Sequence, residues 1–399
     1  MQLVAYGAQD IYLTGNPQIT FFKVVYRRHT NFSMEAIEQT WNGTSDTNGR
    51  CTATISRNGD LVSRMYLEIR GRTAVLVDNP GVNWIKSIEL EIGGQKIDKH
   101  SGLWMETWAE LTEVNPTGQT GTLHNNDTAS TMAGTLFQNM AGYCGTTTTA
   151  AGGGAAYDCI FTVPIQFWFC RNPGLALPLI ALQYHEVKVI LDHSITNSMN
   201  LAIGGGAGTT PTNKLYCDYI YLDTDERRRF AQVSHEYLIE QVQEQTLQQT
   251  QSNDLNFNHP VKELIWCAAG AAAGLANSCT LAVPAAVGTT FNLKLNGHDR
   301  FSTRPSTYFS RTQVYDYHSG YGGLDSGGAG DGRSNDSICV YSFALKPEEH
   351  QPSGTCNFSR IDNAQLISNA NMAALGTIFA VNYNVLRIMS GMGGLAYSN

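Results

Sequence analysis

Apolar and polar residues alternate with a period of two through much of this chain, which is the pattern of half-buried β-strands. The alternating runs are rich in β-branched and aromatic residues, and turn-forming residues separate many of them. The clearest runs span residues 61–69, 160–170, 187–191, 215–222, 261–267, 338–344 and 376–389. The pattern therefore predicts an all-β fold.

Two hairpins along the chain look like copies of each other. Residues 89–100 read ELEIGGQKIDKH, and residues 292–303 read NLKLNGHDRFST. In each, an alternating strand is followed by a pair, Gly93-Gly94 or Asn296-Gly297, that supplies the positive φ angles of a two-residue turn. Because the copies lie about 200 residues apart in a chain of 399, they indicate a duplicated all-β domain.

The runs just before the hairpins, 61–69 and 261–267, form a second matching pair. The repeat is imperfect, since beyond the turn Ile97 matches Phe301 only after a shift of one residue. A β-bulge would absorb that shift. A jump in charge density at residues 223–234 (DTDERRRFAQVS) predicts the boundary between the two halves.

Several segments carry weaker signals. A helix could occupy part of residues 237–249, although Gln-rich polar runs also fit a strand edge or a linker. Residues 142–156, 203–212 and 318–336 are rich in small or polar residues and lack apolar periodicity, so we expect surface loops there. Residues 264–293 carry no charge, but Ala, Gly and polar residues dominate them, so strand, loop and strand is a better interpretation than a membrane span.

Composition excludes some classes of function. Charged residues make up only 15% of the chain and the net charge is -8, so we expect no direct binding to nucleic-acid phosphates. The nine cysteines are odd in number and form no Cys-x-x-Cys pair, which favours buried thiols in a reducing compartment over disulfides or a metal site. The first residues lack the basic region of a signal peptide. A small basic group is either a solvated strand edge or a surface for an acidic or protein partner; it comprises Lys23, Arg27, Arg28 and His29.

The chain shows no recognisable catalytic or cofactor-binding motif. A Gly-x-Gly-x-x-Gly helix start, a Walker A loop and a Gly-x-Ser-x-Gly elbow are missing from the sequence. His185 and His235 are each followed by Glu, but the second His of a zinc motif is missing both times. Other residues that could form an acid–base pair are Asp98, His100, Asp192 and His193. We therefore expect no catalytic, cofactor or metal site, and an assembly or binding protein rather than an enzyme.

Five runs are distinctive enough to indicate a family. They span residues 6–23, 173–188, 235–241, 351–363 and 382–399, from YGAQDIYLTGNPQITFFK to NYNVLRIMSGMGGLAYSN. Together they resemble the major capsid proteins of large icosahedral double-stranded DNA viruses, most strongly those of algal viruses. The resemblance covers nearly the whole chain.

The resemblance implies a double jelly roll, which is two eight-stranded antiparallel sandwiches in one chain. It also implies homotrimers that form pseudo-hexagonal capsomers and tile an icosahedral shell. The implied partners are neighbouring capsomers and minor capsid proteins, with no direct nucleic acid and with an internal virion membrane nearby. The implied location is the outer capsid, assembled in the host cytoplasm. A jelly roll leaves few free strand edges, which suits a shell protein.

By the same resemblance, residues 1–24 form an N-terminal arm, residues 25–222 the first jelly roll, residues 223–234 a linker and residues 235–399 the second jelly roll. The arm is expected to contact neighbouring subunits or the base of the domains. Its apolar side chains for this assembly role are Tyr6, Ile11, Tyr12, Leu13, Phe21 and Phe22.

Some features stay open at this point. The chain is shorter than is typical of the family, so it is either the main capsid protein or a minor paralogue. Residues 173–182 and 351–363 would occupy corresponding places between late strands of the two rolls. Glycans on outer loops are implied by the resemblance but stay unplaced, because the family's usual acceptors are not evident at residues 368–373 (SNANMA). Sequons without a signal peptide are usually chance matches; they stand at Asn31, Asn42, Asn126, Asn335 and Asn357.

The main alternative is a jelly-roll spike or fibre component that binds a carbohydrate or a receptor. Loop aromatics would then stack on sugars, although a trimer interface would explain them equally well. These aromatics are Tyr308, Phe309, Tyr315, Tyr317 and Tyr321. A β-sandwich hydrolase has only scattered carboxylates in its favour.

Overall fold

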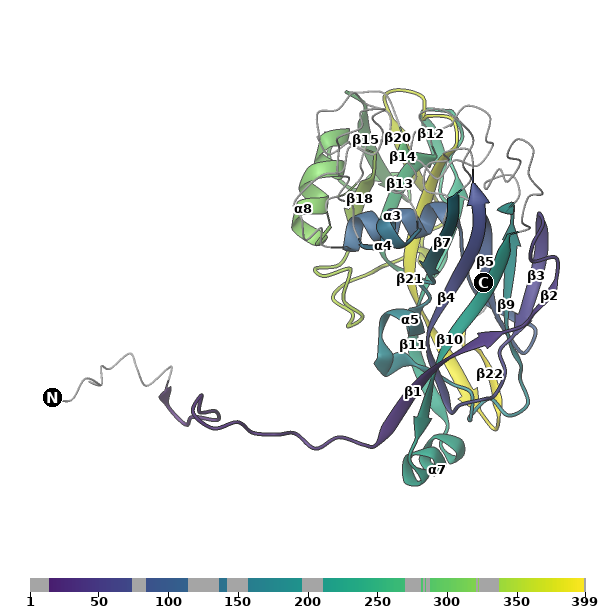
Figure 1. Cartoon of the computed structure of the whole chain (residues 1–399). Coiled ribbons are helices and arrows are strands. Elements are labelled where there is room, and N and C mark those ends of the chain that lie inside the picture. The colour runs from purple at the N-terminus through teal and green to yellow at the C-terminus, as the bar shows by residue number, and fades with distance from the viewer. Residues whose placement is uncertain are drawn as a thin grey trace.

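Strands dominate the protein, and every pairing between them is antiparallel in the part of the chain that the structure describes (Figure 1). The structure is a computed structural model. It describes residues 14–73, 84–113, 136–141, 157–195, 211–269, 281–282, 284, 288–320, 322 and 337–397. The strands form four sheets, arranged as two pairs.

The first pair of sheets packs around one hydrophobic core. One sheet has the order β1 (Phe32–Gln39), β10 (Thr212–Leu222), β4 (Leu61–Thr73) and β7 (Tyr157–Pro164), with β8 (Leu177–Pro178) also on β4. The other has the order β2 (Trp41–Gly43), β3 (Gly49–Thr54), β9 (Val187–His193), β5 (Ile85–Ile92) and β6 (Gln95–His100). Alternate residues of both sheets, such as Leu67 and Val189, are fully buried in this core. The two sheets therefore form a sandwich.

The second pair repeats the arrangement. One sheet has the order β11 (His235–Thr246), β21 (Gly376–Met389) and β13 (Pro260–Ala269), with β14 (Leu281–Ala282), β18 (Cys339–Ser342) and β19 (Cys356–Asn357) on β13 and β22 (Met392–Leu395) on β21. The other has the order β12 (Ser252–Asp254), β20 (Ala364–Ser368), β15 (Thr290–Leu295) and β16 (His298–Asp299), with β17 (Arg304–Pro305) on β15. Leu264, Phe291 and Leu366 lie in the shared core.

The two halves have the same strand order. The sequence β1-β10-β4-β7 of the first half corresponds to β11-β21-β13-β18 of the second. Likewise, β3-β9-β5-β6 corresponds to β12-β20-β15-β16. Each half thus places eight corresponding strands in two antiparallel sheets, which is the jelly-roll arrangement. The prediction of an all-β double jelly roll is confirmed.

The duplicated hairpins occupy equivalent places in the two rolls. β5 pairs with β6 across Gly93-Gly94, with φ angles of 57° and 85°, and β15 pairs with β16 across Asn296-Gly297, with φ angles of 51° and 78°. The first hairpin contains the expected bulge, since Leu90 pairs with Asp98 and Glu91 with Lys96, which leaves Ile97 as the extra residue. The turns and the phase shift are therefore as predicted.

Two local expectations were wrong. Residues 237–249 hold no helix over their first ten positions, because β11 pairs with β21 continuously from His235 to Thr246. A helix instead precedes this strand in the chain. It is α7 (Thr224–Gln232), which begins at the capping side chain of Asp223 and carries acidic residues in its first turn. The strand expected over residues 160–170 ends at Pro164, and α5 (Trp168–Arg171) follows it.

The other helices and helical turns among the described residues are short and connect strands. They are α3 (Gly102–Thr112), α4 (Leu136–Ala141), the turns Pro173–Leu175 and Phe358–Arg360, the π-helical turn Tyr308–Thr312, and α8 (Gln313–Tyr317). None of the described helices has both the length and the apolar character needed to cross a bilayer. The predicted loop over residues 142–156, and most of the loops over 203–212 and 318–336, lie outside the described residues.

No disulfide bond involves Cys51, Cys170, Cys217, Cys267, Cys339 or Cys356. Cys51, Cys217, Cys267 and Cys339 are buried, in keeping with the predicted role as small apolar residues. Burial raises the pKa of the Cys51, Cys170 and Cys267 thiols to about 12, so they stay protonated at neutral pH.

Candidate assembly surfaces and the junction between the halves

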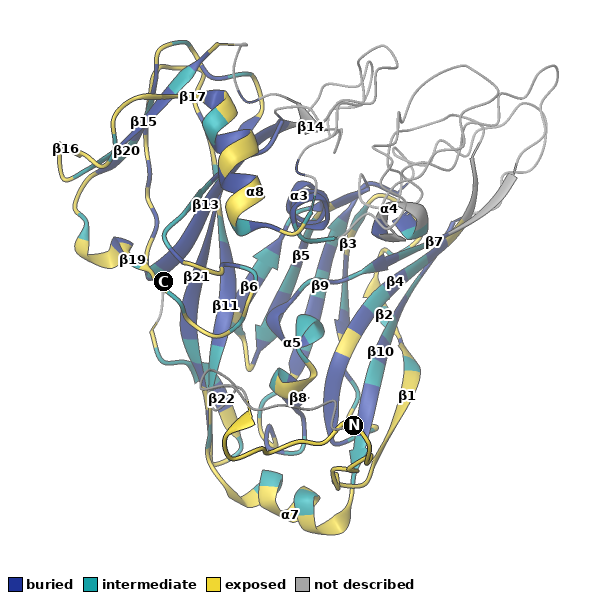
Figure 2. Cartoon of the chain, turned by 90° about the vertical axis from the view of Figure 1, so that its left-hand side faces the viewer, coloured by how far each residue is buried: buried dark blue, intermediate teal, exposed yellow. Residues whose placement is uncertain are grey.

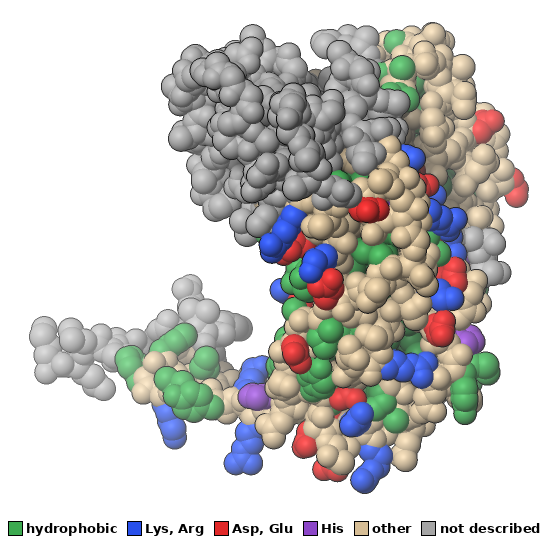
Figure 3. All heavy atoms as spheres, turned by 45° about the vertical axis from the view of Figure 1, so that its right-hand side comes forward, with side chains coloured by type: hydrophobic (Ala, Val, Ile, Leu, Met, Phe, Trp, Pro, Cys, Tyr) green, Lys and Arg blue, Asp and Glu red, His purple; other side chains and the backbone are tan. Residues whose placement is uncertain are grey.

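The N-terminal arm is the most exposed apolar segment that the structure describes. Residues 14–31 precede the first strand and extend away from the body of the protein (Figures 1 and 3). Phe21 is 89% exposed and Phe22 is 98% exposed, and Ile19, Val24, Val25 and Tyr26 are also exposed. A run of uncovered apolar side chains of this kind marks a contact surface for another molecule. Of the predicted assembly residues, Tyr6, Ile11, Tyr12 and Leu13 lie outside the described residues.

A helix of the first half supplies the core that joins the two halves. α3 follows β6, starts at the capping side chain of Ser101, and is buried from Gly102 to Leu111 (Figure 2). Its Trp104 ring lies 5.4 Å from the Trp108 ring and 5.2 Å from the ring of Phe379 on β21. The same cluster holds Leu103, Leu111, Val242, Ile265, Cys267, Val314, Ile338, Val340 and Val381. The two halves therefore share a third hydrophobic core. This core holds them against each other, so they are not joined by a flexible linker alone.

A buried ion cluster lies at this junction. Glu240 on β11 is 4% exposed and places one carboxylate oxygen 3.0 Å from Arg171 of α5 and the other 2.9 Å from the ammonium of Lys262 on β13. His350 Nδ1 lies 3.5 Å from the same carboxylate. Burial alone would raise the pKa of Glu240, but Arg171, His350 and Lys262 outweigh that effect and lower it to about 2. The carboxylate is therefore ionised and joins the two halves.

The cations of this cluster are also held by aromatic rings. Arg171 lies 4.8 Å above the ring of Trp108, and Lys262 lies 5.6 Å from the ring centre of Tyr383. Burial lowers the pKa of the fully buried Lys262, and the carboxylates of Glu240 and Glu263 oppose that fall. Rings and carboxylates together replace the water that these cations lose on burial.

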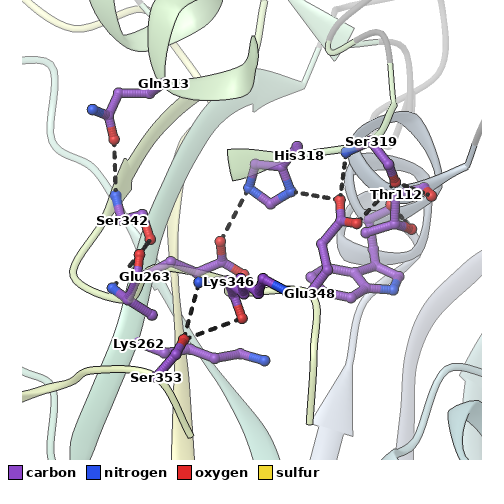
Figure 4. Close-up of polar contacts among 12 residues, drawn as sticks. Thr112, Lys262, Glu263, Gln313, His318, Ser319, Ser342, Lys346, Glu348 and Ser353 are labelled. Carbon is purple, nitrogen blue, oxygen red and sulfur yellow. Dashed lines mark hydrogen bonds and ion pairs between the residues drawn. The ribbon is translucent and has the colours of Figure 1, made fainter. Parts of the chain in front are cut away.

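A second charged cluster is centred on His318, at the end of α8 (Figure 4). Its ring lies 3.1 Å from the carboxylate of Glu263 and 3.1 Å from that of Glu348. Burial alone would lower the pKa of His318, but the two carboxylates outweigh it and raise the pKa to about 9. Burial would raise the pKa of Glu348, and His318 and Ser319 instead lower it. The imidazolium is therefore the charged form at neutral pH.

This second cluster also ties the second half to helix α3. Ser319 donates from its hydroxyl to Glu348 and to the carbonyl of Thr112, at 2.8 and 2.9 Å, and its backbone N–H donates to Glu348 at 2.8 Å (Figure 4). The backbone N–H of Gly320 donates to the carbonyl of Leu111 at 2.8 Å. These bonds satisfy the last carbonyls of α3 and fix its C-terminal end against the second roll.

Strand edges meet at the same junction. A groove of about 690 Å³ runs between β6 and β11 and is lined by Lys86, Lys96 and Lys99 together with polar residues of β11. Beside it, the side chain of Gln241 donates to the carbonyl of Ile97, and the backbone N–H of Val242 donates to Asp98 at 3.2 Å. The edges of β6 and β11 are thus bridged by side chains.

The candidate acid–base residues take structural positions. Asp98 Oδ2 lies 2.9 Å from Nε2 of His100, and both side chains are buried at the junction. His193 contacts the carbonyl of Thr44 at 2.9 Å, and Asp192 lies 3.6 Å from Lys86 on the surface. The structure therefore brings together Asp98 and His100 but not the four residues as one site.

The two His-Glu pairs also lack a shared site. His185 contacts the carbonyl of Gly393 at 2.9 Å, and His235 contacts the carbonyl of Phe230 at 2.8 Å. Within the described ranges, no group of three or more His, Cys, Asp or Glu side chains has the arrangement of a metal site.

The sequence analysis missed Arg171, Glu240, Lys262 and His318. A signal was available for one of them, since Lys262-Glu263 stands inside an otherwise apolar strand, and charges in such a strand are buried with partners or face solvent. The charges on β13 are buried with partners because α3 and α5 cover the sheet that contains it, and the sequence of the strand does not show this. The loop aromatics that were candidates for stacking on sugars do not lie together on the surface. Phe309 is fully buried in the second core, whereas Tyr315 is 87% exposed.

Two jelly rolls joined through a shared core define this chain as a double jelly-roll protein. The family profile for the major capsid protein N-terminus matches residues 20–223, and that for the large eukaryotic DNA virus major capsid protein matches residues 226–394. This chain therefore belongs to the family of major capsid proteins of large eukaryotic DNA viruses.

Individual relatives match over the full length. The major capsid protein of Pyramimonas orientalis virus is 50% identical over 422 aligned positions, which cover 100% of this chain and 99% of the relative. That of Paramecium bursaria Chlorella virus 1 is 41% identical over 467 positions, with the same coverage. Both alignments exceed 399 residues, so the relatives contain insertions that this shorter chain lacks.

Solved structures agree with the fold. PBCV-1 VP54 superposes with a TM-score of 0.72 at 36% sequence identity, covering 95% of this chain and 100% of that chain. The Faustovirus major capsid protein superposes with a TM-score of 0.66 at 14% identity, covering 96% of this chain and 94% of that chain, and shows the shared fold.

Proposed function

We propose that this chain is a structural subunit of the outer icosahedral capsid of a large double-stranded DNA virus and has no catalytic role. The observation that carries the proposal is full-length similarity to major capsid proteins, with the same double jelly roll in both halves. The net charge of -8 supports a shell that does not bind the genome directly. An internal virion membrane would lie beneath it, and assembly would take place in the host cytoplasm.

The assembled unit is a homotrimer. Three chains contribute six jelly rolls, so a trimer with threefold symmetry imitates a hexagon and packs with neighbouring capsomers and minor capsid proteins. This geometry needs the two rolls of each chain to keep one fixed orientation. The core around Trp104 and the ion cluster around Glu240 supply that rigidity.

We assign the first roll to residues 25–222 and the second to residues 235–399, with residues 223–234 between them and residues 1–24 as the arm. The helix α7 and the break between the two family profiles, the first of which ends at residue 223 and the second of which begins at residue 226, support this division. The arm orders on contact with neighbouring subunits through Phe21, Phe22 and the apolar residues before them. Deletion of residues 1–22 is expected to prevent normally packed shells, and recovery of such shells would refute this role.

Size-exclusion chromatography with light scattering tests the trimer. The expected mass is three times 43.6 kDa. A monomer with measurable sugar affinity would instead favour the spike or fibre function. Electron microscopy of the source particle then decides the position in the lattice, including whether the chain is the main capsid protein or a minor paralogue.

A further inference from the structure

The end of the molecule from which the arm leaves also carries an apolar groove. The groove has a volume of about 610 Å³ and is lined by Leu61, Ala176, Phe230, Val233 and Tyr237, among others. Its volume lies in the range of sites that enclose small apolar ligands. Val233 is 54% exposed, so part of this apolar lining is uncovered in the single chain.

The groove has an aromatic wall. The rings of Phe230 and His235 stack at 5.4 Å, and those of His235 and Tyr237 stack at 5.9 Å. The contact of His235 with the carbonyl of Phe230, at 2.8 Å, holds this row between α7 and β11. A further aromatic side chain could continue such a row with favourable ring-to-ring geometry.

The base of the arm lies beside this groove. Phe32, the first residue of β1, pairs with Leu222 at the end of β10. Leu222 packs with Phe230 against the small cluster of Leu61 and Ala176, and three of these four residues line the groove. The arm and the groove are therefore at the same end of the molecule, as the positions of β1 and α7 in Figures 1 and 2 also show.

The chain's own arm does not cover its own groove. Residues 24–31 read VVYRRHTN, with neither Gly nor Pro to reverse the direction of the chain between Phe22 and β1. Phe21 is 89% exposed and Phe22 is 98% exposed, so neither side chain covers the groove of its own chain. Figure 3 shows the hydrophobic side chains of the arm projecting away from the body.

Charge supports the same pairing. Lys23 directly follows Phe22, Arg27 and Arg28 follow a few residues later, and all three are exposed. The groove is lined by the carboxylate of Glu226, by Arg229 and by Glu236, which lies 2.9 Å from Arg387. Cations that follow the aromatic pair along the chain would meet a carboxylate at the rim of an aromatic groove.

We propose that the groove between α7 and β11 receives the Phe21-Phe22 pair of a second copy of this chain. The inference rests on the proposed assembly role of the arm and names its receptor. Exchange of an identical terminal segment between copies links subunits while each arm and each groove is used once. Burying a phenylalanine side chain strengthens association by about tenfold or more, so two anchors would add about a hundredfold or more to other contacts between the subunits.

Cysteine trapping between separately prepared full-length chains tests the contact. One preparation carries Phe22→Cys and the other Val233→Cys, and the two are mixed, assembled and oxidised. A cross-linked dimer that forms only in the mixture is the expected result. The matched control replaces Val233→Cys by Leu345→Cys, at a residue that is 75% exposed and does not line the groove.

Each other outcome overturns the inference. Equal cross-linking to Leu345→Cys, or no cross-linking to Val233→Cys, refutes the groove as the receptor. A chain carrying both Phe22→Cys and Val233→Cys that yields only an intrachain bond refutes the second copy. Thermal unfolding of each single variant checks that the fold is intact.

The outcome is separable from that of the proposed function. Light scattering of the unmodified chain reports the trimer whatever the cross-linking shows. A trimer without the arm-to-groove bond contradicts only this inference, whereas an unmodified chain that stays monomeric contradicts the proposed function.

Discussion

Replacing Glu240 by Gln removes a carboxylate that lies within 3.0 Å of both Arg171 and Lys262. The fully buried Lys262 and the partly buried Arg171 then have a neutral partner. Breaking a buried ion pair from one side costs about 3–5 kcal/mol, because an uncompensated charge is left in the interior. The pKa gives a similar figure, since lowering it from 4.5 to about 2 corresponds to about 3 kcal/mol.

Urea unfolding of the full chain at neutral pH measures this loss as a lower midpoint. The matched control is Glu349→Gln, which breaks an ion pair of the same length, 2.9 Å, with Lys346. Those two side chains are 57% and 67% exposed, so the control is expected to lose less than about 1 kcal/mol. Equal losses of unfolding free energy for Glu240→Gln and Glu349→Gln would refute the idea that burial makes the Glu240 ion pairs stronger.

Two further measurements separate charge from packing. The folded-state pKa of Glu240 is depressed, so its stabilisation is fully present above pH 4.5 and is lost as the pH falls through about 2. The difference between the wild type and Glu240→Gln should shrink over that window. Adding Lys262→Met to Glu240→Gln removes one stranded cation and should recover part of the lost stability. A double variant that is less stable than the single one would contradict this account.

The remaining predictions concern the junction and the hairpins. The folded-state pKa of His318 is raised to about 9, so the stability that its charged ring contributes is fully present below pH 6.5 and is lost as the pH rises through about 9. His318→Gln should remove this pH dependence from urea midpoints measured across that range. Trp104→Ala should cost about 3–5 kcal/mol in the same assay and expose separate unfolding of the two halves by calorimetry, whereas one cooperative transition would contradict the shared core. Gly93→Ala should lower the melting temperature more than Gly297→Ala does, because its added Cβ would lie 2.2 Å from the ring of His185. A Cβ at Gly297 meets open space, so that variant carries only the cost of a positive φ, about 1 kcal/mol. Equal melting temperatures would refute the packing argument.

The strands and their duplication could be read from the chain, but the charged residues of the junction could not. β13 shows why. Lys262 and Glu263 are adjacent in an apolar strand, and alternation places neighbouring side chains on opposite faces. A register shift between Val261 and Glu263 interrupts that alternation, and both side chains are fully buried. The sequence of β13 alone predicts neither the bulge nor the helix that covers the strand.

Residues near the boundary show the same limit at short range. The run DTDERRRFAQVS marked a change of structure, and its capping Asp223 and acidic first turn are local helix signals. The Gln-rich residues after it have no such signals and form a long strand, because β21 offers twelve paired positions. Long-range pairing overrides weak local preference in β-sheets.

The sequence by itself determined the β class and the two hairpins with their turns, because each depends on residues close together in the chain, and the similarity of the hairpins indicated the duplication. The tertiary structure alone decided that α3 joins the halves, that Arg171 meets Glu240, and that an aromatic groove lies beside the base of the arm. These features depend on segments brought together by folding. A period of two identifies the two faces of a strand, but only the packed fold decides what covers each face.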